Sequence, residues 1–292
     1  MALGGKTLAG WSFGRIAGAG AAGLLALSLL APGPALEAAG ANVAEGPVAD
    51  AVRKGIASGT GAFDHSRWEA LVARHVDAEG QVDYAGFRKD RGALEAYLDE
   101  VGRADLASLP RGELLALFIN AYNACTVRLI LDGSAGGRLP ASIRDLPDPW
   151  GRKTCTVGGH ALSLDTIEHG ILRPIFKDSR IHAAVNCASR SCPALVPWAY
   201  RGDRIEDQLG DGIEAMVNAP AHVRVEGGRL RVSRIFDWYK DDFVEGSFKE
   251  AAPTIAEYVL RHARPGLRRQ IEALGPRPRA EFLDYDWSLN GR

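Results

Sequence analysis

Residues 111–132 of this 292-residue chain read RGELLALFINAYNACTVRLILD, with a proline before the segment and a glycine after it. Such flanking residues are typical of a helix start and a helix end. At about 100° per residue, apolar side chains cover nearly the whole circumference, which predicts a helix buried on all sides. Glu113, Asn120 and Asn123 fall within an arc of about 80° on it. Since buried polar groups need partners, these three either hold neighbouring backbone or face a cleft.

The segments around this helix alternate between strand and helix patterns. Glycine pairs predict hairpins at 155–162 and 222–233, and the alternation of apolar with polar or small residues over 181–187 predicts a strand. Apolar spacing predicts further helices near 68–75, 91–101, 163–174, 204–217 and 252–263. We therefore expect one α+β domain over 63–292, most recognisable over 105–245. Its buried central helix packs against a small antiparallel sheet that includes 155–162 and 181–187.

The N-terminus has the pattern of a secretory signal peptide over residues 1–41. Lys6 and Arg15 precede an uncharged run over 16–36, and Ala39-Gly40-Ala41 offers a small-residue cleavage site. The alternative is a retained membrane anchor, which the prolines and glycines of the run disfavour. Residues 42–62 are small, polar and glycine-rich, which predicts a flexible lead-in. We expect export to the periplasm or the extracellular space, with membrane contact only through the signal segment.

The densest chemical cluster is RIHAAVNCASRSCPAL, residues 180–195, in which His182, Cys187 and Cys192 follow one another at short spacing. Four interpretations remain open. Cys187 can be the nucleophile of a thiol hydrolase with a histidine as base. The three residues can hold zinc, although a fourth ligand and the usual cysteine spacing are missing. Cys187 and Cys192 can form a redox or structural disulfide, or both can be inert thiols.

Export places the four cysteines in an oxidising compartment, where three pairing schemes are possible. Because Cys187 and Cys192 lie on one short loop, we expect them to be bonded to each other or within easy reach of bonding. Cys125 lies on the apolar helix, where we expect it to be buried and unpaired. A bridged Cys187 could not be a resting nucleophile, so this expectation opposes the catalytic interpretation.

Aromatic residues dominate two segments near the C-terminus. The segment 233–243 reads SRIFDWYKDDF, and the pattern favours aromatic core with solvated acids. The tail over 282–290 reads FLDYDWSLN, and a chain end this apolar is expected to dock onto the domain. Glu168 and His169 are adjacent on a predicted helix, so their side chains diverge.

Five blocks together resemble the domain of unknown function 547 family: LALFINAYNACTVRLI, GGHALSLDTIEHGILR, RIHAAVNCASRSCPAL, SRIFDWYKDDF and DYDWSLN. They span nearly the whole chain after the signal segment. The resemblance implies distant kinship with papain-like and transglutaminase-like thiol enzymes, in which a cysteine at a helix start packs against strands bearing a histidine and an acid or amide. This sequence departs from that pattern, because Cys125 lies well inside its helix and Cys187 follows His182. Either the geometry is rearranged or the domain is a non-catalytic relative.

Our leading interpretation is a thiol-dependent hydrolase or acyltransferase acting on amide-type substrates in the cell envelope. Cys187 would be the nucleophile and His182 its base, with Glu113, Asn120 or Asn123 orienting or polarising. The candidate pocket residues are Tyr122, Glu168, Asn186, Ser189 and Ser191. The alternative is a non-catalytic domain that binds a peptide, a wall fragment or an envelope protein.

We expect no cofactor and no metal. The partner would be a small substrate or an envelope protein. A formal net charge of −1 leaves no basic excess to neutralise phosphates, which argues against nucleic acid.

Overall fold

A computed structural model describes residues 46–134, 136–244 and 246–291. The predicted signal peptide, residues 1–41, lies outside these ranges. The helices are α1 (Pro47–Ser58), α2 (Ser66–His75), α3 (Tyr84–Lys89), α4 (Arg91–Gly102), α5 (Arg111–Asp132), α6 (Leu164–Ile167), α7 (Ile205–Asn218), α8 (Ile235–Trp238), α9 (Lys240–Phe243), α10 (Ile255–His262) and α11 (Pro265–Glu272). The strands are β1 (Cys155–Val157), β2 (His160–Leu162), β3 (Val223–Glu226), β4 (Arg229–Val232) and β5 (Ala280–Phe282). The mixture confirms an α+β fold.

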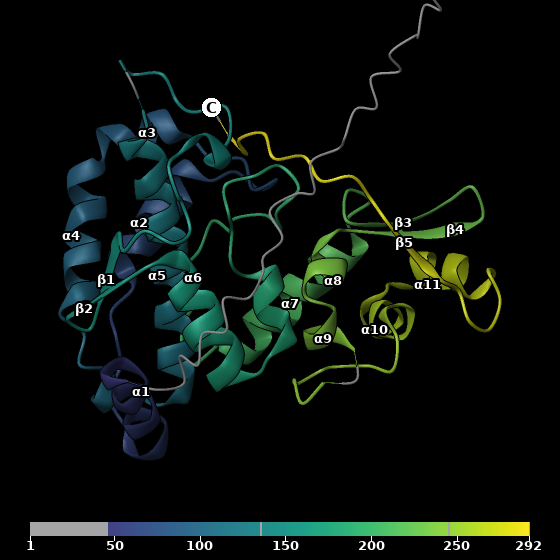
Figure 1. Ribbon diagram of the computed structural model, residues 1–292, viewed down its shortest axis with the longest axis horizontal. Coiled ribbons are helices and arrows are strands. Elements are labelled where there is room, and N and C mark those ends of the chain that lie inside the picture. Colours follow the sequence, from purple (N-terminus) through teal and green to yellow (C-terminus); the bar gives the residue numbers. More distant parts are fainter. Residues whose placement is uncertain (1–45, 135, 245, 292) are drawn as a thin grey trace, which may run out of the picture. The chain divides into compact units, whose positions relative to one another are not determined.

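Helix α5 lies at the centre of the larger core, as predicted (Figure 1). It begins after Pro110, whose lack of a backbone N–H costs nothing before the first helical turn, and ends at Gly133. Helices α1, α4 and α6 and strand β1 all pack against it. By length and composition α5 could also cross a membrane, but 94% of its apolar window is buried inside the protein. It is therefore the core helix of this domain.

The expected flexible lead-in is instead the helix α1. Val48, Ala49 and Val52 are buried on one face of it, and Pro47 occupies its first turn. This face packs against α5 and the short 3₁₀ helix η1 (Leu106–Ser108). Close approach is possible because Gly55 contacts the carbonyl oxygens of Leu106 and Leu109, where a side chain would not fit. The prediction failed because small residues that favour loops also permit tight helix packing.

Strands β1 and β2 form the first predicted hairpin, with Cys155 opposite Leu162. Its turn, Gly158-Gly159, has positive φ at both positions, a conformation that glycine adopts without strain. The chain then enters α6, where Ser163 is the N-cap and its side chain accepts from the N–H of Thr166.

A nine-residue π-helix, η3 (Glu168–Phe176), continues α6. π-helices are rare and often mark functional sites.

Strands β3 and β4 form the second predicted hairpin, and β5 joins β4 in parallel. This sheet and helices α7 to α11 surround a second, smaller apolar core. Residue Ala183 belongs to this second core, while its neighbour Ala184 belongs to the first. The chain therefore passes from the second core to the first at Ala183 and Ala184, just before Cys187.

The predicted strand over 181–187 is wrong. Ser179–Ala183 forms the 3₁₀ helix η4, and residues 184–187 continue without strand pairing in the described structure. Alternation could not identify the element, because both sets of side chains from Ile181 to Asn186 are buried. The antiparallel sheet beside α5 is thus the β1–β2 hairpin alone.

The C-terminal tail docks onto the domain, as expected. The backbone of Leu289 donates to the carbonyl of Ala141, and that of Asn290 donates to the carbonyl of Ala188. Leu289 and Asn290 are buried. The tail thereby lies directly against the loop that carries Cys187.

Candidate functional site

The Cys187 loop turns sharply immediately after the cysteine. Ala188 is fully buried and has φ +61°, a left-handed conformation that is uncommon for a residue with a side chain. The Asn186 side chain holds this turn, because its Oδ1 accepts from the N–H of Ala188 at 2.9 Å and its Nδ2 donates to the carbonyl of Pro193 at 2.7 Å. Strained backbone held by surrounding hydrogen bonds is typical of functional sites.

The thiol of Cys187 is half-buried and lies among hydrogen-bonding groups. Its sulfur is 3.3 Å from Oγ of Ser189 and 3.4 Å from the hydroxyl of Tyr285, and these two hydroxyls contact each other at 2.9 Å. The backbone N–H of Cys187 donates to Sγ of Cys192 at 3.0 Å. The loop and the C-terminal tail therefore build one polar nest around the sulfur.

These contacts favour the thiolate of Cys187. A hydrogen bond with the Cys192 thiol lowers the pKa of Cys187 most, burial opposes it, and bonds from Ser189 and Tyr285 add to the lowering, so that this pKa falls to about 7. Burial raises the pKa of Cys192 well above its ordinary value. Near neutral pH the thiolate is therefore favoured at Cys187 over Cys192.

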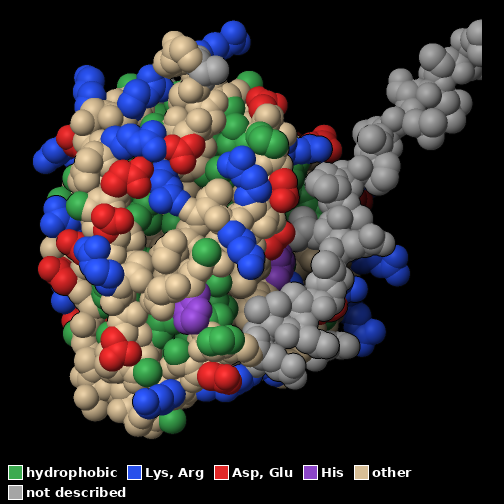
Figure 2. All heavy atoms as spheres, turned by 60° about the vertical axis from the view of Figure 1, so that its left-hand side comes forward, with side chains coloured by type: hydrophobic (Ala, Val, Ile, Leu, Met, Phe, Trp, Pro, Cys, Tyr) green, Lys and Arg blue, Asp and Glu red, His purple; other side chains and the backbone are tan. Residues whose placement is uncertain are grey.

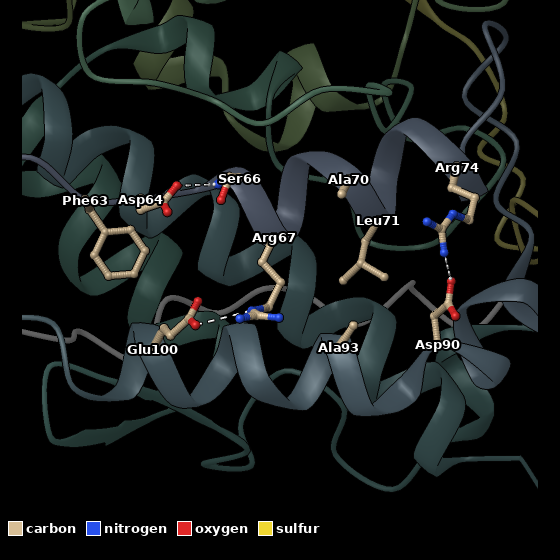
Figure 3. Close-up of a pocket in the computed structure, with 10 residues that line it drawn as sticks. All are labelled: Phe63, Asp64, Ser66, Arg67, Ala70, Leu71, Arg74, Asp90, Ala93 and Glu100. Atoms are coloured by element: carbon tan, nitrogen blue, oxygen red, sulfur yellow. Dashed lines mark hydrogen bonds and ion pairs between the residues drawn. The ribbon is translucent and has the colours of Figure 1, made fainter.

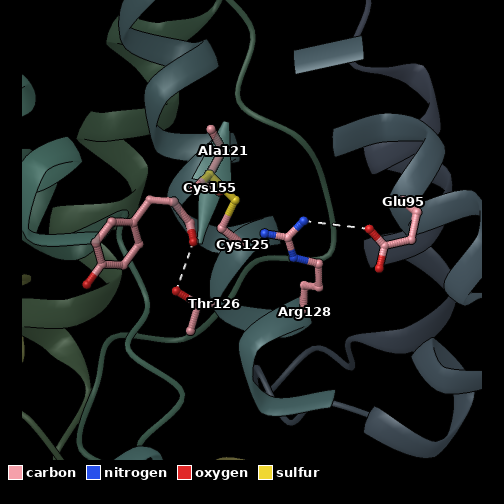
Figure 4. The surroundings of a disulfide bond; sticks show 7 residues. Glu95, Ala121, Cys125, Thr126, Arg128 and Cys155 are labelled. Carbon is pink, nitrogen blue, oxygen red and sulfur yellow. Dashed lines mark hydrogen bonds and ion pairs between the residues drawn. A yellow bond between two sulfur atoms is a disulfide. The ribbon is translucent and has the colours of Figure 1, made fainter. Parts of the chain in front are cut away.

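The disulfide of this domain joins Cys125 to Cys155, with Sγ atoms 2.02 Å apart and Cα atoms 5.7 Å apart (Figure 4). Cys187 and Cys192 are free thiols, so of the two expected alternatives they are not bonded to each other, and their loop holds them close together. Cys125 is buried as expected, but the prediction that it is unpaired is wrong. Packing of β1 against α5 brings Cys155 over Cys125, a contact that no local pattern reveals. The free state of Cys187 removes the objection to a resting nucleophile.

Beneath the loop, His182 forms a buried ion-pair network with Asp242 and Arg173. Nε2 of His182 is 2.7 Å from Oδ2 of Asp242, and Arg173 donates to both carboxylate oxygens at 2.6 and 2.8 Å. Burial raises the pKa of Asp242, but the hydrogen bonds from Arg173 and His182 outweigh it and hold that pKa below its usual value. The ionised carboxylate of Asp242 accepts a hydrogen bond from Nε2 of His182, so Nδ1 is the ring nitrogen that does not contact Asp242.

The free nitrogen of His182 faces Glu168, the first residue of the π-helix η3. Nδ1 is 3.9 Å from Oε1 of Glu168, and this buried atom has no hydrogen-bond partner among the described residues. The ring of Tyr239 stacks on His182 with centroids 3.9 Å apart. Burial first, and then Glu168 and the charge of Cys187, raise the pKa of Tyr239, so its hydroxyl stays protonated. Tyr239 thus lies in electrostatic contact with both the carboxylate and the thiol.

No hydrogen bond joins Cys187 to His182 within the described ranges. His182 is almost fully buried, and Tyr239 covers one face of its ring. The predicted cysteine–histidine pair is therefore not hydrogen-bonded in the described structure, and His182 is instead bonded to Asp242 of a distant segment.

Two asparagines of α5 hold backbone rather than face a cleft. Asn120 donates to the carbonyl of Tyr200 and accepts from its N–H, at 2.8 and 3.0 Å. Asn123 donates to the carbonyl of Ala184 and accepts from the N–H of Asn186, at 2.9 and 2.8 Å. The nitrogen and the oxygen of each amide both hold backbone, which supports a structural role for the two asparagines. Asn123 instead fixes the chain just before Cys187.

The remaining predicted site residues divide into two groups. Glu113 accepts from the N–H of Phe63 at 3.2 Å, far along α5 from Asn123, and Ser191 accepts from the N–H of Asp286 at 2.9 Å. Both are structural contacts. Tyr122 is buried, and burial first, then the charges of Glu168 and Cys187, raise its pKa, which connects it electrostatically to the site.

Sequence reasoning missed four residues of this site, one of which is Arg173. Asp242 and Tyr239 were assigned to solvated acids and aromatic core, and Tyr285 to a docking tail. The sequence signal for Asp242 was its position next to Phe243, an aromatic residue. The structure shows that both residues are buried on α9. Its partners on η3 and η4 are remote in sequence, so the signal could not identify a network.

Surface grooves lie elsewhere on the domain. One of about 550 Å³ runs between α2 and α4, where the ion pairs Arg67–Glu100 and Arg74–Asp90 cross it (Figure 3). Another of about 830 Å³ is lined by α7 and the turn between α10 and α11. Neither is lined by Cys187 or His182. Basic and acidic side chains are interspersed on the face shown in Figure 2.

The zinc interpretation has no geometric support in the described residues, where no group of three or more His, Cys, Asp or Glu side chains is arranged to hold a metal ion.

Comparisons with known proteins give one match. No curated protein and no solved structure matches the chain, so the papain-like kinship has no support from a neighbouring fold. Residues 106–215 contain the core helix α5, the π-helix η3 and the Cys187 loop. This part of the chain matches the family model described as Protein of unknown function, DUF547, which supports assignment to the DUF547 family.

Proposed function

We propose that this protein is a thiol-dependent hydrolase or acyltransferase that acts on amide-type substrates, with Cys187 as the nucleophile. The observation that carries the proposal is the sulfur of Cys187, free and half-buried, with two hydroxyl groups within 3.4 Å. A thiol in such surroundings ionises near neutral pH without direct contact from a base.

The chemistry is that of acyl transfer. The thiolate of Cys187 attacks the substrate carbonyl carbon, an S–C bond forms, and the carbonyl oxygen takes the negative charge. Collapse breaks the C–N bond, and the amine leaves with a proton taken from solvent, which balances the proton that the thiol released to solvent when it ionised. Water then attacks the thioester, releasing the acid and returning a proton to sulfur, or an acceptor amine does so in an acyltransferase.

The buried network acts through position and charge rather than as a direct base. Asp242, itself held by Arg173, fixes the His182 ring. The carboxylate of Glu168 interacts with this ring and also raises the pKa of Tyr239. Tyr239 remains protonated and can donate towards charge that develops near the thiol. We assign His182 and Asp242 as positioning residues, a revision of the general-base role expected from the sequence.

We place this activity in the cell envelope or outside the cell. The signal-like N-terminus supports export, and so does the Cys125–Cys155 disulfide, because such bonds persist mainly in oxidising compartments.

A chromogenic acyl donor tests the proposal. With p-nitrophenyl acetate, the purified protein is expected to release a stoichiometric burst of nitrophenol, to carry an acetyl group on Cys187, and then to turn over. The burst rate should rise with pH around a midpoint near 7, as the thiol ionises. Cys187→Ser should abolish both phases.

Turnover distinguishes the two function classes. If acetylation of Cys187 stops at one equivalent without turnover, or proceeds no faster than with free cysteine, the catalytic proposal fails. The domain would then be a binding module for a peptide, a wall fragment or an envelope protein.

A further inference from the structure

We propose that Cys187 and Cys192 form a dithiol pair that reduces disulfides, in which Cys187 attacks the substrate and Cys192 resolves the mixed disulfide. This activity goes beyond acyl transfer, although both use the Cys187 sulfur. The substrate class is a disulfide of a small thiol or of an exported protein.

The loop folds the two cysteines onto each other. The Cys187 N–H donates directly to the Cys192 sulfur at 3.0 Å, and the N–H of Cys192 donates to the carbonyl of Ser189 at 3.1 Å. The left-handed turn at Ala188 makes this reversal possible, and its hydrogen bonds to Asn186 and to Asn290 hold it. The pair is therefore held close by the backbone rather than brought together by chance.

The two thiols differ in accessibility. Cys187 is half-buried, whereas Cys192 is only 8% exposed. A disulfide from outside can reach Cys187 first, and Cys192 can reach only what is already attached to Cys187. The lowered pKa of Cys187 and the raised pKa of Cys192 agree with these roles, since the attacking group must be a thiolate.

The hydroxyls of Ser189 and Tyr285 serve the second step as well. When Cys192 attacks, the bond between Cys187 and the substrate breaks, and the substrate sulfur leaves as a thiolate. Tyr285 lies within hydrogen-bond reach of the Cys187 sulfur, and burial first, then the cysteine charges, keep its pKa raised and its proton in place. It can therefore stabilise negative charge at this point in the loop.

The exchange balances without a further reagent. The Cys187 thiolate attacks one sulfur of the substrate disulfide, forming a mixed disulfide and releasing the first substrate thiol. Cys192 loses its proton and attacks the Cys187 sulfur, forming the intramolecular bond and releasing the second thiol. The substrate is reduced by two electrons, and the protein dithiol is oxidised by two.

The structural disulfide takes no part in this exchange. Cys125 and Cys155 are each 1% exposed inside the larger core. A reagent that reaches Cys187 in the native state therefore leaves that bond intact, so that changes in thiol count report on the loop alone.

Glutathione disulfide is the probe. Starting with Cys187 and Cys192 reduced, wild type should release both glutathione molecules and gain a Cys187–Cys192 bond, found by peptide mapping without reductant. Cys192→Ser should stop with one glutathionyl group on Cys187, and Cys187→Ser should not react. An unfolded protein with a disulfide, used as a second substrate, separates the two sources: reduction of it alone indicates a protein substrate, and reduction of glutathione disulfide a small thiol.

Several results would overturn the proposal: no Cys187–Cys192 bond in wild type, the same stable adduct in wild type and Cys192→Ser, or reduction of neither disulfide. Near-UV circular dichroism checks that Cys192→Ser is folded, and its serine can still accept from the Cys187 N–H. The ester assay separates this proposal from the first, because acyl transfer needs no second thiol: wild type that turns over p-nitrophenyl acetate but forms no Cys187–Cys192 bond with glutathione disulfide would refute this proposal alone.

Discussion

Asp242 accepts a hydrogen bond from Nε2 of His182 over 2.7 Å, although 60 positions separate the two residues in the chain. The contact links the 3₁₀ helix η4, which leads into the Cys187 loop, to the short helix α9. Arg173 of the π-helix η3 completes the network from a third element. The segment beside the candidate nucleophile is therefore held by charge as well as by apolar packing.

Asp242→Asn should destabilise the domain by about 3 kcal/mol. The substitution removes the buried carboxylate that pairs with the guanidinium of Arg173. Urea unfolding at pH 7 measures the loss. The matched control is Asp241→Asn, the exposed neighbour on the same helix, which should change stability by less than about 0.5 kcal/mol. An equal loss of unfolding free energy in both variants would show that the ion-pair network of Asp242 does not stabilise the domain.

The disulfide should stabilise the domain through the loop it closes. The cysteines are 30 positions apart, and a loop of this length is worth about 3–4 kcal/mol in the chain-entropy account. Cys125→Ala with Cys155→Ala should lower the unfolding free energy by that order. Cys187→Ser is the control and should have little effect. A double alanine variant as stable as wild type would contradict this assignment.

Local patterns predicted the elements whose reasons are local. Helix α5 follows from its apolar run and flanking residues, and both hairpins follow from their glycine turns. Each of these depends on residues close together in the chain. Periodicity and turn chemistry were sufficient for them.

The site could be predicted only in part, because its partners come from distant segments. Cys187 and His182 stand out by residue type, but the pairing of His182 depends on Asp242, and the surroundings of Cys187 depend on Tyr285. The prediction that Cys125 is unpaired was wrong for the same reason, since its bond to Cys155 depends on how β1 packs on α5. Burial on all sides erased the alternation that would have distinguished η4 from a strand.

Stability should fall in mild acid because of two buried histidines. Burial lowers the pKa of His65 and of His222 to about 4. Both are neutral in the folded protein, while the unfolded chain takes up a proton below about pH 6.5. Stability should therefore be complete above pH 6.5 and decline as the pH falls towards 4, by on the order of 1–2 kcal/mol per histidine at pH 5.

Urea unfolding at pH 7 and pH 5 tests this dependence. His222→Gln should remove part of the difference, because it replaces a buried group that titrates only in the unfolded state. If the loss of unfolding free energy between pH 7 and pH 5 is the same in His222→Gln as in wild type, His222 does not cause the acid sensitivity.

The signal-like segment predicts cleavage near Ala41. N-terminal sequencing of protein recovered from the periplasm or the medium should find a chain that begins close to residue 42. Mature protein that still carries residues 1–30 would instead indicate a retained anchor.

Asn290, near the end of the chain, is bonded on every side. Its Oδ1 accepts from the hydroxyl of Tyr84 at 2.8 Å, and its Nδ2 donates to Oδ1 of Asn186 at 3.1 Å. Its backbone donates to the carbonyl of Ala188 and accepts from the N–H of Val82. One buried side chain thus joins the N-terminal helices to the residue that holds the turn after Cys187.

Asn290→Ala should cost about 1–3 kcal/mol, because it leaves the buried Tyr84 hydroxyl without its acceptor and weakens the support of Asn186. It should also slow alkylation of Cys187 at pH 7, since the turn that presents the sulfur is less well held. Urea unfolding and iodoacetamide labelling measure the two effects. Asp284→Asn, an exposed change on the same tail, is the control and should alter neither. If Asn290→Ala lowers stability but leaves the labelling rate of Cys187 unchanged, the tail supports the fold without shaping the thiol, and the link from Asn290 through Asn186 to Cys187 is wrong.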